Sequence, residues 1–362
     1  MKALDLETAP KKGHPQPYAL QPWRVREGTA KITSCAIARE TGNAKTVPGD
    51  VEQIQVILDS LEGAIVATWN GVFDLAWLYA YDLDITKIKW VDAQMLWKWH
   101  SNSQFMERIP RWNLAAGAKR WCKDEKWLSD FVAMKEAEVH AGENDQYWET
   151  RGKMDAYVTA LIAHRIWPLL TEQQQKSVMI EAACMVPTAQ SWVDGIYMDR
   201  ERALDMGTPI EREMRELEKA LGLTQKILAS PAQLAAVMYD TWGLPVEHMT
   251  DGGKSGKKKP ATNKAALTYM ADRDPRMIEI LRWRELNTQW TKFIEGVRKT
   301  GEYLNSSVMH PQPKIFSTYT GRFTYKSRSG QKGEAYKAKI GVPIHQWPRP
   351  KDLRKLLIGG GV

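Results

Sequence analysis

Apolar residues along positions 1–170 alternate between a strand-like and a helix-like period, which predicts interleaved strands and helices. The segments KALDLETA and TAKITSCAIARE show the strand period, and AIVATW is a short apolar run typical of a buried central strand. VEQIQVILDSLEG and GKMDAYVTALIAHRIWPLL keep their apolar residues on one helical stripe. We therefore expect an α/β domain over residues 1–175.

The pattern changes after Pro168, where helical segments dominate. Charged helices are predicted around PIEREMRELEKALGL and MIEILRWRELNTQWTKFI, and SPAQLAAVMYDTWGLPV begins with a serine cap followed by proline. A glycine- and lysine-rich loop at 251–264 separates these helices. From about residue 300 the helical period fades, and YLNSSVMHPQPKIFSTYTGRFTYKS is typical of a β-hairpin. We expect a mainly helical region at 176–300 and a short β-containing region at 301–362.

The chain carries 51 Lys and Arg against 43 Asp and Glu, a net charge of +8. A positive balance of this size favours a polyanionic partner such as nucleic acid. No run has the length and apolar content of a transmembrane helix, and the N-terminus shows no signal peptide, so we expect no membrane partner. The three cysteines are far apart, which suits a reducing compartment and predicts a cytoplasmic location.

Three separated acidic signals lie in the α/β half: Asp5 and Glu7 on the opening strand, Asp74 after the turn at Asn70, and Asp155 near the start of a helix. Residues i and i+2 of a strand share a face, so Asp5 and Glu7 repel each other unless cations bind. Taken alone, each signal is more typical of solvated acids. Together, carboxylates from a strand and two helices can converge on one point and hold divalent ions such as Mg²⁺ or Mn²⁺.

This order of motifs resembles the DEDD exonuclease superfamily, in the form carried by family A DNA polymerases of the bacterial DNA polymerase I class and their phage relatives. The resemblance implies a ribonuclease H-like fold with a mixed sheet, and a 3′–5′ exonuclease that proofreads DNA by two-metal hydrolysis. It implies two Mg²⁺ or Mn²⁺ ions held by four carboxylates: Asp5, Glu7, Asp74 and Asp155. Water or substrate would be positioned by Asn70, Arg151 and Tyr147. Arg151 stands where the family usually has a tyrosine, four residues before the last aspartate.

A second resemblance covers residues of about 180 to 358. Two long helices with a basic tip loop are similar to the thumb of family A polymerases, and Thr-x-x-Gly-Arg at 318–322 is similar to the motif that enters the palm. The resemblance implies that a single-stranded 3′ end enters the exonuclease site and that the thumb grips the primer-template duplex through salt-sensitive phosphate contacts. The implied DNA-binding residues are Lys254, Lys257, Lys258, Lys259, Thr318 and Arg322.

The family places its catalytic palm aspartates and its fingers after the last motif that this sequence matches. We therefore expect a chain that does not polymerise DNA alone and is completed by a second polypeptide with palm and fingers, or else a truncated product. The compact size and divergent motifs resemble phage proteins, which would place the chain in a host cytoplasm. Two alternatives stay open: a weak or inactive exonuclease fold serving as a DNA-binding or assembly subunit, and an RNA-trimming nuclease of the same superfamily.

Overall fold

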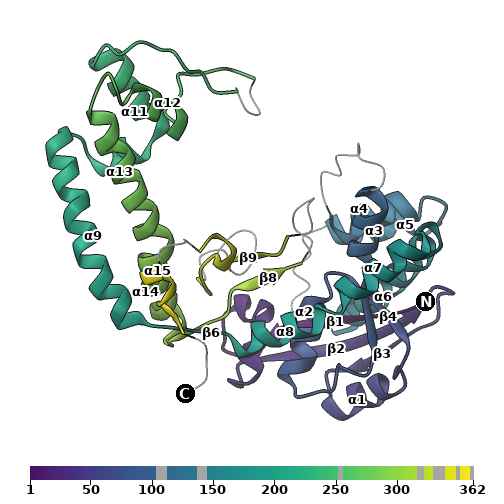
Figure 1. Cartoon of the computed structure of the whole chain (residues 1–362). Helices are drawn as coiled ribbons and strands as arrows, with labels where there is room; N and C mark the ends of the chain where they lie inside the picture. The colour runs from purple at the N-terminus through teal and green to yellow at the C-terminus, as the bar shows by residue number, and fades with distance from the viewer. Residues whose placement is uncertain are drawn as a thin grey trace. The chain divides into compact units, whose positions relative to one another are not determined.

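The computed structural model describes residues 1–102, 112–136, 145–251, 256–315, 322–328, 339–347 and 351–358. The chain divides into two compact units (Figure 1). Unit 1 comprises Met1–Ile196 and Met309–His345, and unit 2 comprises Tyr197–Val308 and Gln346–Val362. The chain therefore leaves unit 1, builds most of unit 2, and returns to unit 1.

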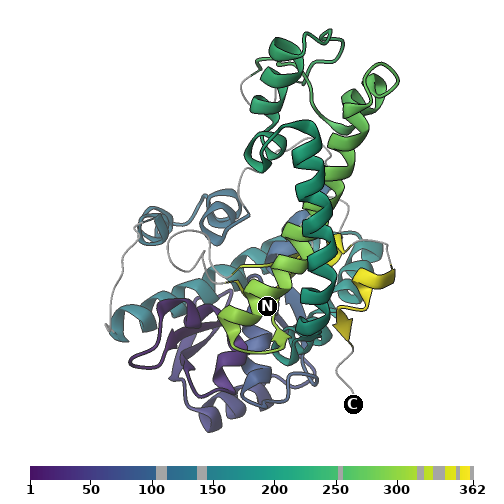
Figure 2. The same cartoon turned by 90° about the vertical axis from the view of Figure 1, so that its left-hand side faces the viewer.

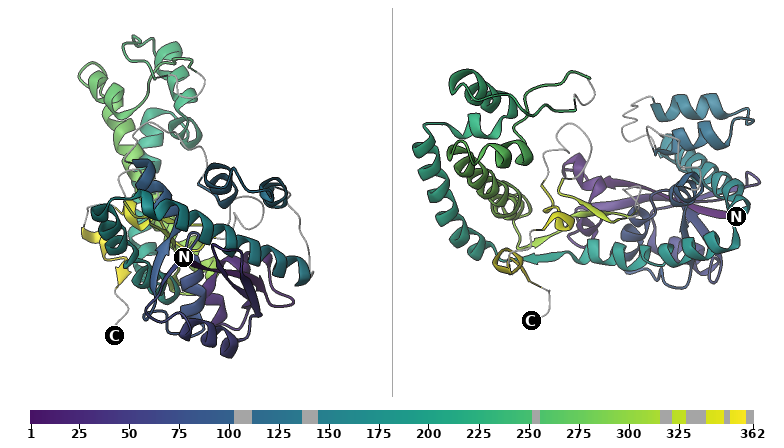
Figure 3. Two further views of the ribbon diagram at one scale, coloured as in Figure 1. Left: turned by 90° about the vertical axis from the view of Figure 1, so that its right-hand side faces the viewer. Right: turned by 45° about the horizontal axis from the view of Figure 1, so that its top comes forward.

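Unit 1 is built on a mixed sheet of five strands in the order β3-β2-β1-β4-β5. The central strand β1 (Lys2–Pro10) pairs antiparallel with β2 (Ala30–Arg39) and parallel with β4 (Ile65–Thr68). Strand β3 (Ala44–Pro48) extends the antiparallel side, and β5 (Lys89–Asp92) extends the parallel side. Figure 3 shows this sheet from two further directions. Because β1 has a neighbour on each edge, the register of the residues it carries is fixed.

Helices cover the sheet of unit 1. The longest of them, α6 (Asp145–Ile166), packs against β1 and β2, while α2 (Val72–Ala80) packs against α8 (Met185–Asp194). Helix α1 (Val51–Asp59) begins at Asp50, whose side chain accepts a hydrogen bond from Gln53 N at 3.0 Å. The other helical segments are η1 (Gln16–Leu20), η2 (Pro22–Val25), α3 (Ala93–Asn102), α4 (Leu114–Trp121), α5 (Leu128–Glu136), η3 (Trp167–Leu169), α7 (Glu172–Ala182) and η8 (Ile344–Gln346).

A tight turn joins β4 to α2. Asn70 has a left-handed backbone with φ of 61°, and Gly71 follows it immediately before the helix. A Cβ atom at Gly71 would lie 1.8 Å from Thr68 Oγ1, so only glycine fits at this point of the turn. The turn stands at the carboxyl end of a parallel strand, the place where such sheets commonly present functional side chains.

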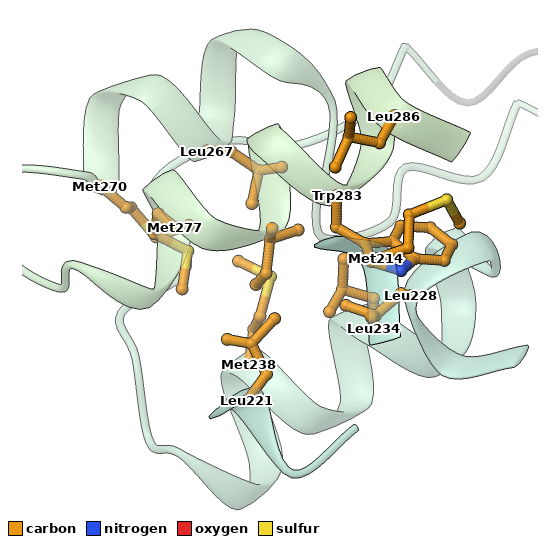
Figure 4. Packing of buried hydrophobic residues seen from close by; sticks show 11 residues of the cluster. Met214, Leu221, Leu228, Leu234, Met238, Leu267, Met270, Met277, Trp283 and Leu286 are labelled. Atoms are coloured by element: carbon orange, nitrogen blue, oxygen red, sulfur yellow. The ribbon is translucent and has the colours of Figure 1, made fainter. Parts of the chain in front are cut away.

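Unit 2 is mainly helical. Helices α9 (Arg200–Leu221) and α13 (Arg276–Gln289) run side by side (Figure 2). In the core of this unit, leucine and methionine side chains pack around Trp283 (Figure 4). Trp283 Nε1 donates to Glu218 Oε1 at 2.9 Å. Asp199 caps α9 by accepting from Arg202 N at 2.9 Å. The other helical segments are α10 (Gln225–Ala229), α11 (Pro231–Ala235), η4 (Ala236–Thr241), α12 (Lys264–Met270), η6 (Trp290–Ile294), α14 (Glu295–Leu304) and α15 (Lys351–Arg354).

Short strands lie before and after the helices of unit 2. Strand β6 (Ile196–Met198) joins β7 (Val308–Met309) and β10 (Leu357–Ile358) in a three-stranded sheet. Strands β8 (Gln312–Lys314) and β9 (Thr324–Lys326) form an antiparallel two-stranded ribbon. The β-hairpin expected for this part of the sequence is thus confirmed.

The α/β class is confirmed in its coarse form, since the structure combines a mixed five-stranded sheet with many helices. The units nevertheless differ in extent from the ranges expected from the sequence. Helices α7 and α8 group with unit 1, and so does the segment Met309–His345. Of the helices in the described part of the chain, none combines the length and the apolar character that crossing a bilayer requires.

Candidate metal centre

Strand β1 carries Asp5 and Glu7 on one face, and both side chains are partly buried. Their partners across the ladder in β2 are Ala36 and Ser34, two small residues. The pairing shifts between Glu7 and Thr8, which marks a β-bulge directly after the second carboxylate. The strand thus presents two acids side by side at a point where its direction changes.

Helix α6 adds a third carboxylate to this face. Arg151 and Asp155 are four residues apart and therefore lie on the same side of the helix. Asp155 is only 5% exposed, and one ligand oxygen each from Asp5, Glu7 and Asp155 lie within 4.8 Å of one another. The sequence pattern places Asp155 near a helix start, but α6 begins ten residues earlier, at Asp145. Asp155 is therefore fixed by helix on both sides.

Asp74 lies beside this group of three carboxylates. It is in the first turn of α2 and is 4% exposed. Its Oδ1 accepts a hydrogen bond from Leu6 N at 3.2 Å, which ties it to the residue between Asp5 and Glu7. The four acids from β1, α2 and α6 thus belong to one buried region of unit 1.

Burial governs the acidity of these groups. It raises the pKa of Asp5 well above the ordinary value, and repulsion from Asp155, Glu7 and Asp74 raises that pKa further. Burial likewise raises the pKa of Asp74. It raises the pKa of Glu7 to about 7, although the nearby Arg151 acts in the opposite direction. Carboxyls whose ionised form is disfavoured in this way gain strongly from a bound cation.

Two basic side chains already contact the carboxylates. Lys135, in the last turn of α5, donates from Nζ to Asp155 Oδ2 at 2.6 Å. Arg151 Nε lies 3.5 Å from Glu7 Oε1 and 3.8 Å from Asp155 Oδ2. The Arg151 guanidinium also stacks over the Trp148 ring, 5.0 Å from its centroid. Lys135 was not predicted from the sequence, because a lysine on a helix is usually solvated and nothing in its spacing links it to Asp155.

The donor set fits a divalent ion. Asp155 Oδ1 is buried and has no hydrogen-bond partner, while its other oxygen is bound by Lys135. Carboxylate oxygens are the ligands that Mg²⁺ and Mn²⁺ prefer. An unpartnered buried oxygen next to two further carboxylates is therefore suited to coordinating such an ion.

Asn70 and Tyr147 are the two other residues expected to position water or substrate. Asn70 is exposed and forms the turn before α2. Tyr147 packs edge-on against Trp148, with ring centroids 5.4 Å apart. A residue not singled out in the sequence, Asp92, holds the Asn70 turn instead. Its carboxylate is buried and accepts hydrogen bonds from Gly71 N at 3.1 Å and Gln94 N at 2.8 Å.

The residues expected to bind DNA are only partly described. Lys254 and Thr318 lie outside the described residues. Lys257, Lys258 and Lys259 are exposed, and Thr250 N donates to Lys259 O at 2.8 Å, which closes the base of the tip loop. Arg322 is exposed and precedes β9. The basic tip of unit 2 thus presents three lysines on a closed loop.

A second basic group, formed by Lys98, Lys314 and Lys326, lies in unit 1. Lys314 and Lys326 share one face of the β8–β9 ribbon, and all three lysines are half-buried. Burial and, to a lesser degree, repulsion by Lys314 together lower the pKa of Lys98 to about 8 and that of Lys326 to about 8, while Asp92 acts in the opposite direction on Lys98. Lys98 Nζ also lies 5.4 Å from the centroid of the half-buried Trp112 ring. Gathered ammonium groups beside an aromatic ring are typical of sites for nucleic acid strands.

No protein-family model matches the sequence, and no curated protein matches it. A similar solved structure is the POL domain of Pol1 from M. smegmatis, in complex with DNA primer-template and dNTP, with 15% identity and a TM-score of 0.62. The match covers 97% of this chain and 54% of that chain, so this chain spans about half the length of the polymerase structure. The likeness shows that this chain shares the fold of part of a family A DNA polymerase.

Proposed function

We propose that this protein is a divalent-metal-dependent 3′–5′ exonuclease acting on DNA, within a polymerase-like chain. The observation that carries the proposal is the approach of Asp5, Glu7 and Asp155 to within 4.8 Å, with Asp74 hydrogen-bonded to the same strand. The mixed order of the sheet, in which β1 is antiparallel to β2 and parallel to β4, supports a ribonuclease H-like domain. Surface acids without a function do not usually gather at buried positions on three separate elements.

The chemistry follows from the placement of the side chains. A bound divalent ion supplies a water of lowered pKa and neutralises charge that develops on the scissile phosphate. Asp5, Glu7 and Asp155 would hold the ion. The hydrogen bond from Leu6 N orients Asp74 toward the same region. Arg151, half-buried beside Glu7, is placed to receive a phosphate oxygen through its guanidinium.

Binding of DNA is supported by two basic groups and by the fold. Lys257, Lys258 and Lys259 present charge on the tip loop of unit 2. The lysine group of Lys98, Lys314 and Lys326 and the Trp112 ring provide contacts for a single strand in unit 1. The structure to which the chain is similar was solved with DNA primer-template. Proofreading, a phage origin and completion by a second polypeptide with palm and fingers stay predictions from the sequence.

The test is hydrolysis of a 5′-labelled single-stranded DNA in Mg²⁺ or Mn²⁺. We expect stepwise shortening from the 3′ end, and a loss of at least roughly 100-fold in the Asp5→Asn and Asp155→Asn variants, because each removes a charged ligand. Asp59→Asn is the matched control, since Asp59 is an exposed acid at the end of α1. Shortening that survives both site substitutions would contradict the proposal.

A second candidate function is a DNA-binding subunit with little hydrolytic activity. It is favoured by Lys135 and Arg151, which already neutralise part of the carboxylate charge. The same assay separates the two functions. Retained DNA binding with no shortening in either metal would support the binding subunit.

A further inference from the structure

The Lys135 ammonium lies where a metal ion could otherwise bind, against an oxygen of Asp155. Its ammonium bonds Asp155 Oδ2 at 2.6 Å, and both side chains are largely buried, with exposures of 17% and 7%. The other Asp155 oxygen, Oδ1, is buried and has no partner. One carboxylate therefore offers one oxygen to a fixed cation and keeps the second for another ligand.

The sum of the side-chain charges in the candidate metal centre indicates how many divalent ions the centre can bind. Asp5, Glu7, Asp74 and Asp155 carry four negative charges when ionised. Lys135 and Arg151 contribute two positive charges from within the protein. One divalent ion then brings the centre to neutrality, whereas a second would leave two uncompensated positive charges in a buried site, which is costly.

We propose that this centre binds a single divalent ion and that the Lys135 ammonium takes the place of a second one. The inference rests on the proposed function and deepens it, since it concerns the same carboxylates. Lys135 is better suited than Arg151 to this role, because an ammonium is a compact point charge in direct contact with Asp155. Arg151 lies farther from the same oxygen, at 3.8 Å, and is engaged with Glu7 and the Trp148 ring.

The placement of Lys135 also explains how α5 contributes to the centre. Helix α5 otherwise supplies none of the carboxylates, and its last turn reaches the centre through this one ammonium. The Lys135–Asp155 contact joins residues 20 positions apart in the chain. Because the Lys135 ammonium is part of the protein, its contact with Asp155 does not require an ion to bind from solution. The contact therefore remains in place at low metal concentration.

The experiment is a count of Mn²⁺ bound per chain, by electron paramagnetic resonance and by calorimetry, on the full chain. We expect one ion for the wild type and two for Lys135→Met, with Lys135→Gln as a second variant if the first does not fold. Lys153→Met is the matched control, because Lys153 lies on α6 and pairs with the exposed Glu149 at 2.6 Å. That control should bind one ion, as the wild type does.

The other outcomes each decide the matter. Two ions in the wild type would overturn the inference and leave the nuclease proposal standing. One ion in both the wild type and the Lys135 variants would show that Lys135 does not replace a metal, and would also overturn it. Ions bound only after Lys135 is removed would mean that the lysine excludes metal altogether, and would overturn the inference of a single bound ion. No ion in any variant, together with no hydrolysis, would instead overturn the proposed function.

Discussion

Asp92 shows how a buried carboxylate outside the group of three can control the centre. It is the last residue of β5 and accepts hydrogen bonds from Gly71 N and from Gln94 N. The first bond fixes the turn before α2, and Asp74 lies in the first turn of that helix. Burial raises the pKa of Asp92, although the Lys98 ammonium and the backbone donors act in the opposite direction.

We therefore expect Asp92→Ala to weaken both stability and hydrolysis. Loss of the acceptor takes a hydrogen-bond partner from the backbone N–H groups of Gly71, Gln94 and Met95, and should cost about 1–3 kcal/mol in the free energy of unfolding. A displaced Asp74 should lower the hydrolysis rate by up to roughly 100-fold. Asp50→Ala is the control: it removes the α1 cap, should cost about 1 kcal/mol, and should leave the rate per folded molecule unchanged. Equal rates for the two variants would contradict the positioning role of Asp92.

At the scale of single residues, the acids could be anticipated and the bases could not. Asp5, Glu7, Asp74 and Asp155 draw attention only as a set, because carboxylates from a strand and from two helices can converge on one point. Lys135 has no such signal, since lysines on helices are common and its partner is distant in sequence. The sequence gives no sign of the role of Asp92 either, because an aspartate ahead of a helix is first explained as an N-cap.

Among the elements, β5 and β3 were missed while β1, β2 and β4 were expected. KWVD is only four residues long and runs directly into α3, so its apolar residues merge with the helical stripe that follows. Strand β3 lies at the edge of the sheet and contains Lys45 and Pro48, which weaken the strand pattern. The missing strand β5 mattered most, because it carries Asp92 to the turn at Asn70.

A buried histidine joins the returning segment of unit 1 to α8. His310 donates from Nδ1 to Trp192 O at 3.0 Å, and Trp192 Nε1 donates back to His310 O at 3.2 Å. The imidazole also stacks on Trp23 with ring centroids 4.3 Å apart. Burial lowers the pKa of His310 to about 4. The ring is therefore neutral at physiological pH.

This arrangement predicts that His310 contributes a loss of stability in mild acid, opposite in direction to Asp5, Glu7 and Asp74, whose raised pKa values favour the folded chain as pH falls. Between pH values of about 6.5 and 4 the unfolded chain binds a proton at His310 and the folded chain does not, so stability falls as pH falls. The expected loss is about 2 kcal/mol between pH 7 and pH 5. Denaturant unfolding at the two pH values measures it as the difference between the wild type and His310→Gln, which should lack this contribution. His14→Gln, at an exposed histidine, should retain it; an unchanged slope in His310→Gln would refute the assignment.

At the scale of the whole molecule, the net charge of +8 agrees with a polyanionic partner. Charge alone does not say where the partner binds. The exposed tip-loop lysines of unit 2 and the half-buried lysine group of unit 1 differ in surroundings, and only the tip loop could be anticipated from its run of lysines. The lysine group of unit 1 brings α3 together with the β8–β9 ribbon, more than 200 residues later in the chain, and no local pattern reveals such a pairing.

Replacing Lys257, Lys258 and Lys259 with alanine should weaken binding of duplex DNA and flatten its salt dependence. Each lost phosphate contact reduces the slope of log K against log salt by about 0.9. Binding measured over a salt series tests this. The control replaces the exposed Lys11, Lys12 and Lys126 with alanine, which changes net charge by the same amount. If both triple variants lose affinity equally, overall charge and not the loop is responsible.

The return of the chain to unit 1 has a practical consequence for anyone who wishes to excise the α/β half. A gene fragment that stops at Ile196 would lack the β8–β9 ribbon, and would leave Trp23 and Trp192 without the imidazole that lies against them. The apolar surface uncovered in this way favours aggregation during expression. A usable fragment would have to join residues 309–345 to residue 196 through a short artificial linker. One continuous polypeptide would then contain both segments that form unit 1.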